Sequence, residues 1–126
     1  MKCRVVAIDD FNRDAKRLGK KYVSLKGDLK ELETQLCKNP RMGIMIRENT
    51  YKIRLAVKSK GKGKSSGMRI ITYVVEIEIA VEADDKDQDF TVILVAIYDK
   101  SEIENLPDKQ LRELIEDIEA ELNEEE

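Results

Sequence analysis

The chain has 126 residues, of which 41% are hydrophobic and 39% are charged, and its formal net charge at pH 7 is −3. This length and apolar content fit a single domain over residues 1–126, with one core that needs neither metal nor disulfides. The chain contains no histidine and only two cysteines, which excludes Ser-His-Asp and Cys-His triads and argues against a zinc site. We therefore expect no metal and no cofactor.

The charge is distributed unevenly along the chain. Residues 41–69 contain nine basic residues and one acidic residue, a local net charge of +8, whereas residues 101–126 carry −9. This asymmetry indicates a basic site for a polyanion, beside an acidic surface that stays in water or meets a basic partner.

The N-terminal residues MKCRVVAIDD contain only a short apolar run followed by acids, which does not fit a signal peptide. No apolar stretch approaches the roughly 18 residues that span a bilayer. Cys3 and Cys37 sit among apolar periodic residues without metal-ligand spacing, so we expect two buried, reduced thiols. A disulfide needs an oxidising compartment and nothing points to export, so the expected location is the cytoplasm.

The first forty residues predict a strand at 3–8 followed by two short amphipathic helices in a hairpin. Asp9 and Asp10 offer an N-cap for the first helix, and Ser24 offers one for the second. Pro40 ends the second helix, because the residue before a proline avoids the α region. The apolar stripes of the two helices are Phe11, Ala15, Leu18 and Tyr22, then Leu25, Leu29, Leu32 and Leu36.

From Ile46 the apolar period changes to two, which predicts a strand up to Lys58. One face of this strand belongs to the core and carries Tyr51, Ile53, Leu55 and Val57. The other face carries Lys52, Arg54, Ala56 and Lys58. If the next hairpin is centred near residues 62 and 63, Ala56 pairs with Arg69 and Arg69 joins the cationic face; this register is an assumption.

The remaining chain predicts a Lys-Gly-Ser loop at 60–67, strands at 68–81 and 90–98, and an acidic turn at 84–89. The second of these strands is apolar on both faces, which suits a central strand. Ser101 and Glu104 form a capping-box pattern, and after Pro107 a helix restarts near Asp108. The order β-α-α-β-β-β-α, with an antiparallel meander and helices on one sheet face, predicts an α+β fold whose other face is partly open.

Two local patterns imitate known ligand sites without meeting their requirements. Gly63-Lys64-Ser65 copies the end of a Walker A loop, but Lys58 stands where the first glycine belongs and a β segment follows. The acids at 84–89 lack the glycine and glutamate of a calcium loop, so a solvated turn is favoured. The C-terminal glutamates form either a solvated helix face or a contact for a basic partner.

The cationic face is itself open to two interpretations. It is either a solvated surface without a ligand or a phosphate-binding platform, and the ratio of nine cations to one acid favours phosphate.

Several segments resemble, in their order along the chain, the RelE/HigB-like toxins of bacterial toxin–antitoxin modules, within the RelE/ParE superfamily. They are the helical hairpin FNRDAKRLGKKYVSLKGDL at 11–29, YKIRL at 51–55, GKGKSSG at 61–67, MRIITYVV at 68–75 and AIYDKSEIENL at 96–106. The resemblance implies a RelE-like fold and a metal-independent endoribonuclease, an mRNA interferase that cuts mRNA on the ribosome and inhibits translation. It further implies a cognate antitoxin, the ribosome and mRNA as partners, a homo-oligomer or a hetero-oligomer with the antitoxin, and no membrane.

The same resemblance assigns site residues by motif position. Arg54 and Arg69 would bind the phosphate in the transition state, and Lys52 or Lys100, placed among other cations, would serve as base or acid. The implied RNA-gripping rim consists of Lys58, Lys60, Lys62 and Lys64.

The chain departs from the family pattern at one place. A C-terminal tyrosine that some members use is replaced near Leu106, so the acid and base stay open; Tyr98 and Tyr73 are either substitutes or core residues. Asp99 stands next to Lys100 and would neutralise it if the two paired. The alternative function is therefore a non-catalytic or inactive RelE-fold binding module, or a ParE-like toxin that acts on a protein such as gyrase.

Overall fold

A computed structural model describes residues 2–60, 67–82 and 85–124 of the chain, without the side chains of residues 78–82 and 85–87. The elements are β1 Cys3–Ala7, α1 Asp9–Lys21, α2 Leu25–Lys38, β2 Ile44–Arg47, β3 Thr50–Leu55, the short 3-10 helix η1 Lys58–Lys60, β4 Met68–Glu82, β5 Asp85–Asp99 and α3 Asp108–Glu124. The prediction of an α+β fold is confirmed, because the α-helices accompany one five-stranded mixed sheet.

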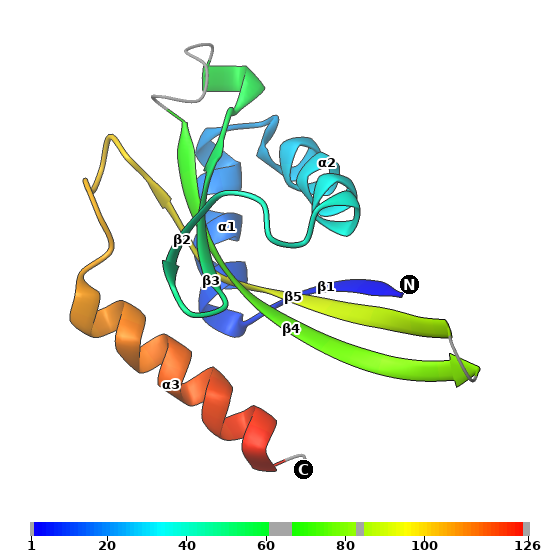
Figure 1. Ribbon diagram of the computed structural model, residues 1–126. Coiled ribbons are helices and arrows are strands. Elements are labelled where there is room, and N and C mark those ends of the chain that lie inside the picture. Colours follow the sequence, from blue (N-terminus) through cyan, green and yellow to red (C-terminus); the bar gives the residue numbers. More distant parts are fainter. Residues whose placement is uncertain (1, 61–66, 83–84, 125–126) are drawn as a thin grey trace.

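The sheet has the strand order β1-β5-β4-β3-β2 (Figure 1). β1 runs parallel to β5, and all other neighbours pair antiparallel. β5 lies between β1 and β4, so the prediction that this strand is central is confirmed. β2 forms one edge of the sheet, and its four residues are all exposed.

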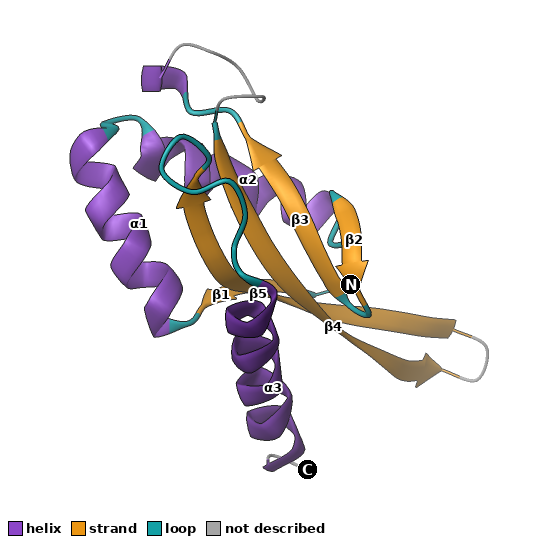
Figure 2. Cartoon of the chain, turned by 90° about the vertical axis from the view of Figure 1, so that its left-hand side faces the viewer, coloured by secondary structure: helices purple, strands orange, loops and turns teal. Residues whose placement is uncertain are grey.

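Helices cover both faces of the sheet, as Figure 2 shows from the side. On one face, α1 and α2 bury a cluster that includes Leu18, Leu32 and Ile70. On the other face, α3 covers a second cluster that includes Ile71 and Ile115. The prediction that all helices pack on one face was wrong, because β4 and β5 carry apolar side chains on both faces and the stripe of α3 buries the second set.

The expected strand from 46 to 58 is also wrong in its extent. The chain turns between β2 and β3, where Asn49 adopts a left-handed conformation with φ 61°. β3 then ends at Leu55 and the chain enters η1. The core face was predicted correctly, since Tyr51, Ile53 and Val57 are buried.

None of the three predicted helix caps forms as a cap. The N-cap of α1 is Ile8, without a side-chain capping bond, and Asp9 and Asp10 lie inside the first turn of the helix. Ser24 stands at the N-cap of α2 without a side-chain capping bond, and its hydroxyl instead donates to Asp28 Oδ2 over 2.7 Å. Residues 101–106 form turns and bends, and α3 begins only at Asp108. Ser101 uses both its backbone amide and its hydroxyl to bind Asp99 Oδ1, which satisfies that hydroxyl locally.

Cys3 and Cys37 form a disulfide, with their Cα atoms 5.5 Å apart. The prediction of two buried, reduced thiols was wrong, because the last turn of α2 lies beside the first residue of β1 and both side chains are only half-buried. Within the described part of the chain, no helix is long and apolar enough to cross a membrane.

Candidate functional site

A groove of about 610 Å³ lies on the same sheet face as α3, in the part of that face that α3 does not cover, near the end of β3. We call it the cationic groove, because it is lined by Lys52, Arg54, Arg69 and Lys100. These are the four residues to which the resemblance noted in the sequence assigns catalytic roles, and all four line the same groove. Glu104 and Asn105, from the connection between β5 and α3, also line the groove.

Strand register explains how the two arginines meet. Arg54 pairs directly with Arg69, and Lys52 pairs with Ile71. The assumed pairing of Ala56 with Arg69 was wrong by two residues. Because side chains alternate between faces along a strand, a shift of two keeps Arg69 on the cationic face. Arg69 is also the register partner of Tyr98 on β5.

The cations of the groove differ in their environment. Arg69 is buried, with 4% of its surface exposed, whereas Arg54 and Lys100 are exposed. The Nζ of Lys52 donates to Asn105 Oδ1 over 3.2 Å, which joins β3 to the segment that follows β5. A charge on a buried guanidinium acts in a lower dielectric than a surface charge, so Arg69 would interact strongly with an anion in the groove.

Gly43 and β2 form the outer wall of the groove. Gly43 has φ 99°, and a Cβ at this position would lie 2.5 Å from the backbone oxygen of Lys52. Only glycine therefore lets the chain pass this close to β3. The wall continues with Ile44 and Ile46, whose exposed fractions are 64% and 36%.

Of the four residues expected to grip RNA, neither Lys58 nor Lys60 lines this groove. The Nζ of Lys58 pairs with Glu31 of α2 over 3.4 Å, on the opposite side of the sheet, so its predicted place on the cationic face was wrong. Lys60 points to Asp99, with 2.7 Å between Nζ and Oδ1. Lys62 and Lys64 lie outside the described residues.

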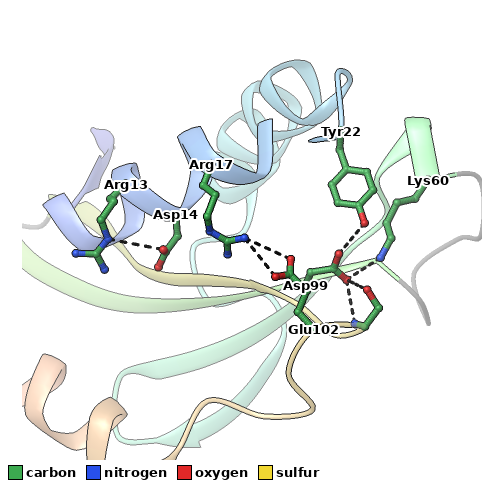
Figure 3. A network of polar contacts seen from close by, with 8 residues as sticks. Arg13, Asp14, Arg17, Tyr22, Lys60, Asp99 and Glu102 are labelled. Atoms are coloured by element: carbon green, nitrogen blue, oxygen red, sulfur yellow. Dashed lines mark hydrogen bonds and ion pairs between the residues drawn. The ribbon is translucent and has the colours of Figure 1, made fainter. Parts of the chain in front are cut away.

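Asp99 is a buried residue that binds side chains from several elements (Figure 3), a role that the sequence does not indicate. We call it the Asp99 junction. Its carboxylate accepts hydrogen bonds from Lys60, Ser101 and the hydroxyl of Tyr22. Burial alone would raise the pKa of Asp99, but these donors outweigh burial and hold the pKa well below its usual range. Asp99 therefore ties α1, η1 and β5 together and does not neutralise Lys100 through a hydrogen bond or ion pair within the described residues.

The connection Lys100–Pro107 lies between the cationic groove and α1. Arg17 of α1 forms an ion pair with Glu102 over 3.3 Å, as Figure 3 shows. The hydrogen bond from Lys52 to Asn105 attaches the same connection to β3, so side-chain contacts hold it to both α1 and β3. No sequence signal marks Asn105 as part of the site, because its partner is distant in the chain.

Both candidate tyrosines are buried. Tyr98 is 4% exposed, and burial raises the pKa of its hydroxyl, against the lowering influence of the Leu106 amide and the charge of Arg69. Burial and the charge of Glu119 raise the pKa of Tyr73, which packs with α3. In both tyrosines the raised pKa favours the protonated hydroxyl.

No group of three or more metal-ligating side chains occurs among the described residues. No protein family model matches this chain, and comparisons with curated proteins and with solved structures likewise found no match. The chemistry of the cationic groove is therefore the basis for inferring a function.

Proposed function

We propose that the chain is an mRNA-cleaving toxin of the RelE/HigB type that binds a phosphate of single-stranded mRNA in the cationic groove. The observation that carries the proposal is the convergence of Lys52, Arg54, Arg69 and Lys100 on one groove. These cations come from β3, β4 and the residue after β5, so their proximity depends on the strand register.

The two arginines suit the phosphate that is attacked. A guanidinium offers planar pairs of N–H donors that match phosphate oxygens, and such charge-assisted bonds are among the strongest hydrogen bonds in proteins. Arg54 and Arg69 occupy one cross-strand pair, so both can face the same ligand. Donors fixed in this way stabilise the additional negative charge that develops on the phosphate in the transition state.

The proposed reaction balances without a metal or a cofactor. The ribose 2′-oxygen forms a bond to phosphorus while the bond from phosphorus to the 5′-oxygen breaks, which yields a 2′,3′-cyclic phosphate and a 5′-hydroxyl. A base removes the proton of the 2′-hydroxyl, and an acid supplies a proton to the departing 5′-oxygen. Lys52 and Lys100 line the groove and are the proposed proton-transfer residues.

The proposal includes a RelE-like fold, action on ribosomes, restraint by an antitoxin, and a cytoplasmic location. The Cys3–Cys37 disulfide bears on that location, because cytosolic disulfides are rare outside hyperthermophiles. Trapping cellular thiols with an alkylating reagent tests this point. Two modified cysteines in freshly lysed cells are expected in a mesophilic cytoplasm, and an intact disulfide would oppose that location.

Expression of the chain in bacterial cells without an antitoxin tests the activity. Growth and translation are expected to stop, and primer extension on cellular mRNA should show cuts in phase with codons. Arg54→Ala should remove the cuts, whereas Lys26→Ala, which deletes the same charge from the exposed face of α2, should retain them. Unimpaired growth with intact mRNA, at a verified level of folded protein, would refute the proposal.

A second function is favoured by the exposed edge of the sheet. Ile44 and Met45 of β2 are 64% and 61% exposed, and an edge strand can pair with a strand of another protein. This edge fits the alternative of a non-catalytic or ParE-like module that binds a protein target. Growth arrest with intact mRNA would favour this function over RNA cleavage.

A further inference from the structure

The proposed reaction needs a proton acceptor, and the cations of the cationic groove are poorly suited to that role. An ordinary lysine has a pKa well above neutrality, so its ammonium group donates a proton more readily than it accepts one. An arginine guanidinium does not lose its proton in proteins, and the chain contains no histidine. The four cations that line the groove therefore suit phosphate binding and proton donation, and the acceptor has to be another group.

Glu104 is the one residue with a carboxylate among the described residues that line the cationic groove. It belongs to the connection between β5 and α3, and it is exposed. Its side chain forms no ion pair or hydrogen bond with another described residue, although four cations line the same groove. A carboxylate without an internal partner can accept a hydrogen bond, and then a proton, from a ligand hydroxyl. Glu104 therefore supplies the property that the cations lack.

Contacts on both sides hold Glu104 in its place along the connection. On the N-terminal side, the backbone oxygen of Asp99 accepts from the amide of Glu102 over 2.9 Å, which closes a turn. On the C-terminal side, Asn105 Oδ1 accepts from Lys52 Nζ on β3 over 3.2 Å. Glu104 therefore lies one residue away from a contact with a cation of the groove, in a segment that is attached to the sheet.

We infer that Glu104 is the general base of the proposed reaction and accepts the proton of the attacking ribose 2′-hydroxyl. This inference rests on the proposed function and assigns the proton acceptor, which the sequence leaves open. It narrows the role of Lys52 and Lys100 to donation of the proton that the departing 5′-oxygen takes up. The two proton transfers are thus divided between a carboxylate and an ammonium group that line one groove.

The protons and electrons of this step balance without any group from outside the groove except water. A carboxylate oxygen of Glu104 takes the 2′-proton as the 2′-oxygen forms its bond to phosphorus. The bond from phosphorus to the 5′-oxygen breaks with its electron pair on oxygen, and a lysine ammonium group protonates that oxygen. Glu104 then releases its proton to water and the lysine takes one up, so both side chains return to their starting states.

Glu104→Gln tests the inference, and because the side chain is exposed the variant is expected to fold, which circular dichroism verifies. Single-turnover cleavage of a defined mRNA on purified ribosomes, at rising concentrations of the whole chain, gives a maximal rate and a half-saturating concentration. The maximal rate should fall roughly 100- to 10,000-fold, the usual contribution of a general base. The half-saturating concentration should stay equal or become lower, because a negative charge leaves an anion-binding groove. Glu116→Gln, the same change at an exposed residue of α3 outside the groove, should match the wild type.

A substrate with a sulfur leaving group separates the base from the acid. In this mRNA, sulfur replaces the 5′-oxygen of the scissile bond, and it departs without a proton because a thiol is far more acidic than an alcohol. Loss of the acid is then tolerated, whereas loss of the base is not. Glu104→Gln should therefore stay roughly 100-fold or more below the wild type on this mRNA. The variant that lacks the acid, Lys52→Ala or Lys100→Ala, should recover to within about tenfold of the wild type.

The outcomes distinguish this inference from the proposed function. Cleavage by Glu104→Gln at the wild-type rate would overturn the base role and leave the proposed function intact. Recovery of Glu104→Gln on the sulfur substrate would also overturn the base role, because the residue would then act as the acid. A raised half-saturating concentration with an unchanged maximal rate would assign Glu104 to binding alone and overturn the base role as well. Absence of cleavage by the wild-type chain would instead refute the proposed function, and the inference with it.

Discussion

Arg54 on β3 lies directly opposite Arg69 on β4, so two guanidinium groups share one cross-strand pair at the base of the cationic groove. Like charges in directly opposed positions destabilise a sheet. A bound anion would relieve this repulsion. The stability of the protein is therefore expected to depend on anions that enter the groove.

The first prediction concerns inorganic phosphate. At ten times its Kd, phosphate should stabilise the wild-type chain by about 1.4 kcal/mol, which raises the Tm by roughly 5 °C. Arg54→Ala should lose most of this increment because it removes one phosphate-binding donor. Differential scanning calorimetry over a series of phosphate concentrations, at constant ionic strength, measures this rise in Tm. Lys26→Ala provides the matched control. An equal rise in Tm for Arg54→Ala and Lys26→Ala would contradict a specific anion site.

The second prediction concerns the buried pair of Asp99 and Lys60. Their side chains are 0% and 11% exposed, and removing one partner of such a pair typically costs about 3–5 kcal/mol. Asp99→Ala should therefore lower the free energy of unfolding by about this amount. Glu102→Ala breaks the exposed pair with Arg17 and should cost less than about 1 kcal/mol. Urea unfolding monitored by circular dichroism compares the two, and similar losses would show that the Asp99 junction has no special role.

The third prediction concerns the pH dependence of that junction. The pKa of Asp99 in the folded state lies below that of the unfolded chain, so its carboxylate contributes stability that is fully present above about pH 4. This contribution is lost as the pH falls below that value and the folded-state carboxyl becomes protonated. The difference in unfolding free energy between the wild type and Asp99→Asn should shrink from pH 5 to pH 2. A difference in unfolding free energy that stays constant from pH 5 to pH 2 would contradict a lowered pKa of Asp99 in the folded state.

The fourth prediction concerns the disulfide. Cys3 and Cys37 are separated by 34 positions, and closing a loop of this length in the unfolded chain stabilises the folded state by up to about 4 kcal/mol. Reduction should therefore lower the unfolding midpoint of the wild type. The double variant Cys3→Ser, Cys37→Ser should start at the lower value and should not respond to reductant. Identical midpoints for all four samples would show that the bond does not stabilise the fold.

The alternation of side chains made the cationic face predictable. Lys52 and Arg54 had to share a face because strand residues alternate, and Arg69 stayed with them although the assumed register was wrong by two. Lys58 could not be placed in this way. Its backbone amide donates to Asp28 of α2, a contact between residues 30 positions apart that has no local signature.

The other differences between the predicted and the observed structure also arise from contacts between residues that are distant in the sequence. The apolar stripe of α3 predicts that one side of the helix is buried, but it does not say which face of the sheet receives it. The spacing of Cys3 and Cys37 does not show that β1 and the end of α2 lie side by side. The contacts of Asp99 join three elements that are distant in the sequence, and local patterns do not predict such long-range contacts.

The strand order has a consequence for the assembly of the protein during folding. β2, β3, β4 and β5 pair with their neighbours in sequence, whereas β1 pairs with β5 and must wait until nearly all of the sheet-forming chain exists. Short-range hairpins close faster than long-range parallel pairs, because they lose less loop-closure entropy. The strands that carry Lys52, Arg54 and Arg69 can therefore come together before the N-terminal strand docks, so formation of the groove need not depend on that last, slow pairing.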